Sequence, residues 1–174
     1  MSQIEWRESA TAAANAAREL PRMMSGYFEE VRDALARNTK AANLHPVRLA
    51  SKKIRYTLEL FRDCYGAEFD QRMEALKDVQ TALGDVNDAV ASAALLKDVM
   101  PNSEERKNVR EFLKKRAAEK AEEFRVHWTQ QFDAAGEETR WLTFLRHPRG
   151  HAATARTKAK RPAAKKSRKQ PTRS

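Results

Sequence analysis

The chain has 174 residues, of which 41% are hydrophobic, with a formal net charge of +10 and a single cysteine, Cys64. This length suits one domain with a real core, and one cysteine excludes both an internal disulfide framework and a thiolate cluster for zinc. The N-terminus lacks the basic start and apolar run of a signal peptide, and no stretch reaches the ~20 apolar residues of a membrane span, so a cytoplasmic protein is expected.

The positive charge is concentrated at the C-terminal end. Residues Arg146 to Ser174 hold six Arg, five Lys and no acid, whereas the preceding 145 residues carry 23 basic and 24 acidic side chains. The C-terminal segment has no large apolar residue, so it cannot bury enough surface to offset the entropy of ordering it. We therefore predict a folded domain over 1–145 and a disordered basic tail over 146–174. Any anion site in the domain then requires local clustering of cations.

The low Gly and Pro content, with many Ala, Glu, Lys, Arg and Leu, favours an all-α fold. In chain order, apolar and small residues recur at helical spacing from Glu5 to Arg37, which predicts a first helix. Pro21 lies within it, so the helix either kinks there or splits into two pieces.

A polar connection precedes the second predicted helix. Asn43 can cap this helix, whose first turn accommodates Pro46. The helix is expected to run to about Tyr65, and Gly66 is its stop signal.

A third helix is predicted from about Asp70 to Val99, where Pro101 ends it. Ser103 begins a fourth helix that is expected to reach about Ala135. Four long amphipathic helices with short polar links predict an antiparallel four-helix bundle. The segment that follows, 140–145, is expected to pack Trp141 and Phe144 on an outer groove or end of it.

The second helix carries the most informative cluster of charges. At about 100° per residue, one arc of roughly 100° collects its basic side chains together with one acid, while the opposite side is apolar. The members of the arc are His45, Arg48, Lys52, Arg55, Glu59 and Arg62. The apolar side consists of Val47, Ala50, Ile54, Leu58 and Phe61.

Such a row of cations fits a ligand with regularly repeated negative charge, such as inorganic polyphosphate. Arg48 and Arg55 offer planar forks for phosphate oxygens, and Lys52 offers a compact charge. His45 lies near the helix N-terminus, where free N–H groups and the helix dipole also favour an anion. The alternative is a solvated helix face in which Glu59 merely pairs with a neighbouring arginine.

Two stretches, LHPVRLASKKIRYTLELF and LKDVQTALGDVNDAVA, resemble the CHAD family, the conserved histidine α-helical domains. The similarity rests on His45-x-x-Arg48-x-x-x-Lys52-x-x-Arg55-Tyr56 and on Leu76-x-x-x-Gln80-x-x-Leu83-Gly84-x-x-x-Asp88. It extends over roughly 6–135 and is strongest over 44–92. The resemblance implies non-catalytic binding of polyphosphate, often with recruitment to polyphosphate granules. The resemblance also implies that His45, Arg48, Lys52 and Arg55 contact the anion, with Lys53 and Arg62 as further candidates.

The chain departs from the family in holding one copy of each signature, whereas the usual family domain has two four-helix units. Symmetric pairing of two chains in a homodimer would supply the second unit. Elsewhere, Gln80, Asn87 and Asp88 are expected to hydrogen-bond neighbouring segments, and Gly84 is expected to permit close helix approach. Further cations, namely Lys107, Arg110, Lys114 and Arg125, share an arc of the fourth helix and form either a solvated face or an extension of the basic surface.

No nucleophile, base and orienting group recur together, and glycine-rich phosphate loops are absent, so an enzyme is not expected. Asp85 and Asp88 are two carboxylates without further ligands, and neither a metal nor a cofactor is predicted. The main alternative function is a nucleic-acid-associated protein that makes salt-sensitive backbone contacts through its basic tail. A scaffold for partner helices is a third possibility.

Overall fold

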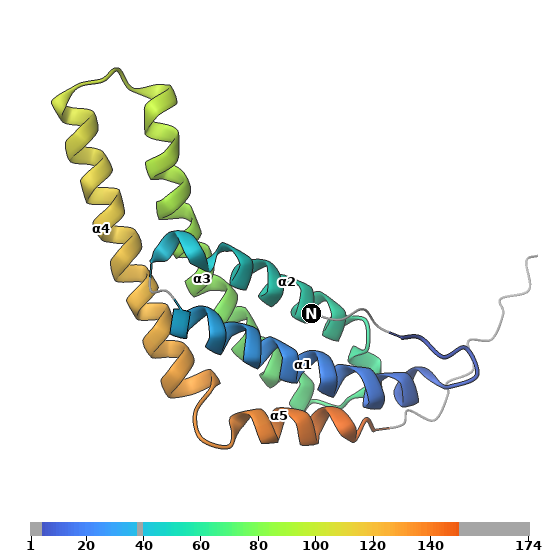
Figure 1. Cartoon of the computed structure of the whole chain (residues 1–174). Helices are drawn as coiled ribbons and strands as arrows, with labels where there is room; N and C mark the ends of the chain where they lie inside the picture. The colour runs from blue at the N-terminus through green and yellow to red at the C-terminus, as the bar shows by residue number, and fades with distance from the viewer. Residues whose placement is uncertain (1–4, 38–39, 150–174) are drawn as a thin grey trace, which may run out of the picture.

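The computed structural model describes residues 5–37 and 40–149, and this part of the chain contains five α-helices and no strand (Figure 1). The helices are α1 (Ala12–Arg37), α2 (His45–Glu59), α3 (Glu68–Val99), α4 (Glu104–His127) and α5 (Glu137–Arg146). Short 3-10 helices at Ala41–Leu44 and Arg62–Cys64 flank α2, and a π-helical turn at Trp128–Phe132 continues α4. The all-α class is confirmed.

The helices form a body from which one hairpin projects. α1 and α2 pack against each other, α2 packs on α3, and α5 packs along α1. α3 and α4 run antiparallel, and their joined ends extend beyond the other helices (Figure 1). A regular antiparallel four-helix bundle is not confirmed, because a fifth helix covers α1 and the hairpin stands clear of the body.

A cluster of aromatic rings closes the body where α1, the end of α4 and α5 meet. The Trp128 ring lies 4.9 Å from the Phe132 ring and 5.6 Å from the rings of Tyr27 and Phe28. Trp141 of α5 extends the cluster at 5.7 Å from Phe132. These contacts bury the apolar side of α1 and fix α5, so the expected packing of Trp141 against the other helices is confirmed.

The first helix begins later than predicted, at Ala12. The buried side chain of Asn15 accepts a hydrogen bond from the Arg7 amide at 3.0 Å and donates one to the Arg7 carbonyl at 3.0 Å. These bonds fold the preceding segment back on the helix, which explains why the predicted start at Glu5 was wrong. Pro21 lies within one continuous helix, so the predicted alternative of a split at this residue is excluded.

The second helix is shorter than predicted, because α2 ends at Glu59 and not near Tyr65. The Tyr65 hydroxyl donates to the Leu145 carbonyl at 2.8 Å, and its ring lies 5.1 Å from the ring of Phe144. This packing against α5 draws the chain out of the helical path. Pro46 occupies the first turn as expected, whereas Asn43 is not the cap, since Leu44 holds that position without a side-chain bond.

The two hairpin helices follow the prediction more closely. α3 ends at Val99 and Pro101 lies in the link, and the Ser103 hydroxyl caps α4 by accepting from the Arg106 amide at 3.3 Å. The fourth helix ends at His127, earlier than predicted. Among the described residues, no helix has both the length and the apolar character required to cross a membrane. Cys64 is half-buried, and burial raises the pKa of its thiol.

Gly84 does not serve the close helix approach that was predicted for it. A Cβ atom built at this position would meet no heavy atom within 4 Å. We therefore expect Gly84→Ala to stabilise the protein by about 1 kcal/mol, because alanine restricts the unfolded chain and favours the helix. Thermal unfolding measures the shift. Gly136→Ala is the control of opposite sign, since Gly136 has φ +86° and alanine is strained there. Equal effects of both changes would contradict this explanation.

The predicted disorder of the basic tail falls almost entirely outside the described residues. Only the stretch up to Arg149 belongs to the described part of the chain.

Candidate anion-binding surface

α2 is held to the body along one side and offers the other side to solvent. Val47, Ile54 and Leu58 are buried against the neighbouring helices. Buried Ser51 donates to the Val47 carbonyl at 2.8 Å and lies 2.7 Å from the Tyr27 hydroxyl, which is thereby placed to donate to it. These contacts tie α2 to α1. The outer side chains of α2 therefore project from a fixed helix.

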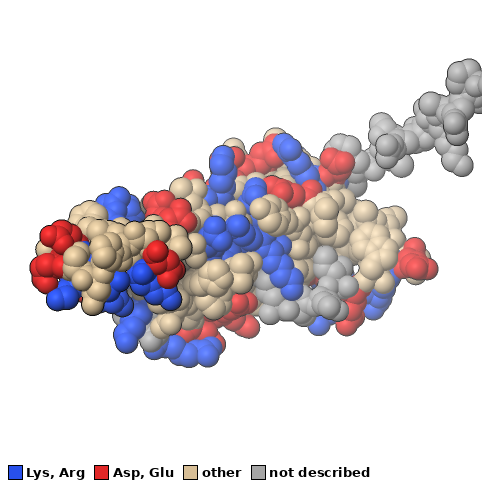
Figure 2. All heavy atoms as spheres, turned by 90° about the horizontal axis from the view of Figure 1, so that it is seen from above, with Lys and Arg blue, Asp and Glu red and all other residues tan. Residues whose placement is uncertain are grey.

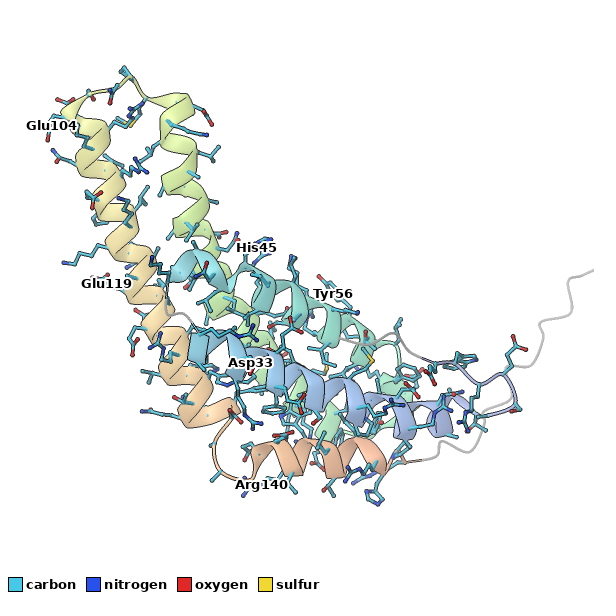
Figure 3. All side chains as sticks on the ribbon, viewed as in Figure 1. Asp33, His45, Tyr56, Glu104, Glu119 and Arg140 are labelled. Carbon is cyan, nitrogen blue, oxygen red and sulfur yellow. The ribbon has the colours of Figure 1, made fainter. Side chains whose placement is uncertain are left out.

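α3 holds α2 from its other edge through two polar side chains. The Gln80 amide donates to the Ser51 carbonyl at 2.7 Å, and the Asn87 Oδ1 lies 3.0 Å from Nδ1 of His45. Both residues were expected to hydrogen-bond neighbouring segments, and this is confirmed, whereas Asp88, for which the same was expected, forms no hydrogen bond or ion pair in the described part of the chain. Because Asn87 engages Nδ1, the other ring nitrogen of exposed His45 is left for a ligand. Figure 3 shows His45 and Tyr56 on the outer side of α2.

Two cations of α2 are available for an external anion. Arg48 and Lys52 lie about one helical turn apart and are half-buried along their stems. Within the part of the chain that the structure describes, neither side chain forms an ion pair or a hydrogen bond. With His45 and Arg55 they form what we call the basic row. Their spacing agrees with the arc expected from the sequence.

The C-terminal part of the predicted cluster is neutralised by acids. Arg55 pairs with Glu59 at 2.7 Å and lies 4.7 Å from the Tyr56 ring centre. Arg62 lies beyond the end of α2 in a 3-10 helix, where it pairs with Asp70 at 2.9 Å. The helical row that was predicted to continue to Arg62 therefore ends at α2. Free positive charge is greatest in the N-terminal two thirds of the helix.

Lys53 points away from the basic row. It lies about 100° around the helix from Lys52, on the side that carries exposed Leu49, Tyr56 and Leu60. In the described structure its side chain has no ion-pair or hydrogen-bond partner. A ligand lying along Arg48 and Lys52 would meet Lys53 only at its margin.

The hairpin contributes cations that the sequence reading largely missed. A cavity of about 300 Å³ between the outer parts of α3 and α4 is lined by Lys97, Arg106 and Arg110, together with Ala94. Ala94 lies seven residues after Asn87, so it lies two helical turns further along the same side of α3 as the residue that contacts His45. Arg106 is held by the Met100 carbonyl at 3.2 Å and by Asn102.

Lys97 and Arg110 make no ion pair or hydrogen bond with other described side chains. Figure 2, which shows the molecule from above the view of Figure 1, has Lys and Arg gathered near the middle of that face with acids around them. The seven-residue spacing of Gln80, Asn87 and Ala94 can be read from the sequence. That Lys97 of α3 lies near Arg110 of α4 cannot, because it depends on how the hairpin packs.

Most of the α4 cations considered from the sequence are engaged by nearby acids. Lys107 pairs with Glu104 at 2.9 Å, Lys114 with Glu111 at 2.6 Å, and Arg125 with Glu122 at 3.5 Å. Arg110 forms no such ion pair within the described residues. These pairs indicate a solvated face along much of α4.

Another cavity, of about 480 Å³, lies at the end of the body away from the hairpin and is lined by Arg72, Arg140 and Arg149. Arg72 pairs with Glu68 at 2.8 Å and lies 4.6 Å from the Phe144 ring centre. Arg140 pairs with Glu137, so two of the three arginines that line this cavity are engaged by acids. No group of three or more metal-ligating side chains occurs among the described residues.

Comparison with known proteins agrees with the motifs on α2 and α3. The family model described as the CHAD domain matches residues 3–97, which include α1, α2 and nearly all of α3. The match is shorter than the resemblance expected from the sequence, and α4 and α5 lie outside it. No curated protein and no solved structure matches the chain. Because the matched region covers more than half of its residues, the chain belongs to the CHAD domain family.

Proposed function

We propose that the basic row on α2 binds inorganic polyphosphate. CHAD domains are associated in general with polyphosphate and triphosphate compounds. The observation that carries the proposal is the pair Arg48 and Lys52, which lie one turn apart on a fixed helix without acidic partners among the described residues. A polyphosphate chain repeats one negative charge per unit, so successive units can meet successive cations.

The hairpin cations offer a continuation of the same surface. Asn87 contacts His45, and Ala94 of the basic cavity lies two helical turns further along the same side of α3. Lys97 and Arg110 are therefore placed beyond the N-terminal end of α2. A flexible polyanion that leaves the basic row at His45 would meet them next.

The proposed role is binding without chemical change of the ligand. A solvated row of cations supplies electrostatic attraction but no nucleophile and base arranged around a reacting atom. The physiological consequence would be recruitment of the protein to polyphosphate granules in the cytoplasm.

Removing the basic tail separates this proposal from nucleic-acid binding. We expect a chain truncated after Arg149 to keep most of its affinity for polyphosphate, because the basic row remains intact. Duplex DNA binding should fall steeply, since the tail holds most of the non-specific positive charge. Fluorescence anisotropy with labelled polyphosphate and labelled DNA, at one fixed salt concentration, measures both affinities. Loss of both ligands on truncation would place the anion site in the tail and refute the proposal.

A further inference from the structure

The outer half of the hairpin carries large apolar side chains that nothing in the described structure covers. No residue between Ala89 and Ala117 is buried. Four apolar residues there are exposed: Leu95 by 58%, Val99 by 71%, Val109 by 38% and Phe112 by 65%. We call these four residues the apolar stripe.

The apolar stripe lies on one side of the hairpin. A cavity on that side, nearer the body, is lined by Thr81 and Asp85 of α3 and by Lys120 and Glu123 of α4. Leu95 and Val99 follow Thr81 and Asp85 by 14 residues, or about four helical turns. Val109 and Phe112 precede Lys120 and Glu123 by 11 residues, or about three turns. Both helices therefore present their apolar residues on the same side.

Two helices that touch only each other cannot hide such a stripe. Short helices are marginal in water unless an apolar face is packed, and contiguous exposed apolar residues mark an interaction surface. The outer half of the hairpin therefore presents a surface suited to contact with another protein surface.

The charges beside the stripe identify its occupant. On α4, Glu105, Val109, Phe112 and Arg116 are spaced by four, three and four residues, so they form one line along the helix. When a second α4 lies antiparallel to the first and both are centred between Val109 and Phe112, Glu105 of each copy lies opposite Arg116 of the other. Val109 of each copy then lies opposite Phe112 of the other. A second α4 running antiparallel therefore meets both apolar and charged complements.

We propose that two copies of this chain associate through the apolar stripe, with α4 packing antiparallel on α4 of the partner subunit about a two-fold axis. Such an interface uses the same patch on both copies, which is the commonest arrangement in homo-oligomers. The inference goes beyond the proposed function, since it involves no phosphate ligand.

Both charged side chains are exposed on α4. Arg116 has no ion-pair or hydrogen-bond partner in the described structure. Hydrogen bonds from its own backbone amide and from Ser103 lower the pKa of Glu105, which keeps this carboxylate charged. Each copy then contributes one cation and one anion, and the two-fold axis generates two opposite-charge pairs.

The overlap is small, so the expected dimer is weak. Antiparallel pairing centred between Val109 and Phe112 leaves roughly 20 Å of overlap along the helix axis. The two helices of each hairpin, α3 and α4, are together about 20 Å wide. This projected area, on the order of 400 Å² per copy, lies at the low end for specific interfaces. A concentration-dependent dimer with a micromolar dissociation constant is expected.

Sedimentation velocity of the full chain and of charge-swapped variants tests the proposal. Glu105→Arg places two cations opposite each other, and Arg116→Glu places two anions opposite each other, so either change should weaken the dimer about tenfold or more. The double variant restores opposite charges, and we expect its dissociation constant to return close to that of the parent. Phe112→Ser should abolish the dimer, with little effect on folding because Phe112 is exposed.

Glu104→Arg is the matched control, because this substitution makes the same change of charge in the same helical turn. Glu104 lies off the line that contains Glu105 and Arg116, and it pairs with Lys107. Circular dichroism checks that each variant is folded. A parent chain that remains monomeric throughout the micromolar range would overturn the proposal. Failure of the double variant to recover the dimer would also overturn it, because the antiparallel α4 pairing would then be wrong.

Discussion

The double variant Arg48→Gln/Lys52→Gln is expected to bind polyphosphate about 10- to 100-fold more weakly than the parent, as two charge-assisted contacts are lost at ~1 kcal/mol or more each. Neither side chain has an ion-pair or hydrogen-bond partner among the described residues, so the free energy of unfolding should change by less than about 0.5 kcal/mol. Isothermal titration calorimetry measures the affinity, and urea denaturation measures the stability.

Salt dependence adds a readout that a mere structural disturbance would not reproduce. Each lost cation–phosphate contact should reduce the slope of log affinity against log salt by about 0.7, if polyphosphate behaves like a single-stranded nucleic acid. The matched control is Lys115→Gln/Arg146→Gln, which removes two exposed charges from α4 and α5. Equal weakening by both double variants would show that net charge, and not the basic row, governs binding.

Glu59→Gln provides a change of opposite sign on the same helix. It removes the acid that pairs with Arg55 at 2.7 Å and releases this arginine for the ligand. Tighter binding is therefore expected from a substitution that adds no cation. Unchanged or weaker binding would place the ligand away from the C-terminal end of the basic row.

Trp128→Ala is expected to destabilise the protein by about 3–5 kcal/mol, because it opens a cavity in the cluster that joins α1 to the end of α4. The ring is fully buried and packs against both Phe28 and Phe132. Since domains of this size are stable by only ~5–15 kcal/mol, the unfolding midpoint in urea should drop sharply.

Trp6→Ala is the matched control for the loss of an indole ring. Trp6 is 53% exposed and has one aromatic neighbour, Phe61, at 6.2 Å. Its removal should lower the free energy of unfolding by under about 1 kcal/mol. Similar destabilisation by the two changes would show that the aromatic cluster is not the main support of the fold.

The helices were predictable where local signals and packing agree. Pro101 and Ser103 mark the junction of α3 and α4, and the buried residues in the inner half of α3 recur at helical spacing. The errors occur where distant contacts prevail. α2 stops early because Tyr65 bonds to α5, and α1 starts late because Asn15 binds the preceding loop. Neither contact leaves a periodic signal in the sequence.

The basic row was predictable because one helix carries it, so spacing alone determines its arc. The sequence also suggested that Glu59 could pair with a neighbouring arginine, since both lie on the same helix. Pairing of Arg62 with Asp70 was not predictable, because it depends on the chain leaving the helix after Glu59. The same applies to Lys97 and Arg110, which meet only through the packing of the hairpin.

The apolar stripe lies at the outer end of the α3–α4 hairpin, away from the body that holds the basic row. Two chains joined antiparallel through the stripe would consequently place their α2 helices at opposite ends of the particle. Such a particle could not enclose one strand in a single groove. It would instead grip two strands, or two distant stretches of one long strand, and so act as a crosslinker whose effect grows with polymer length.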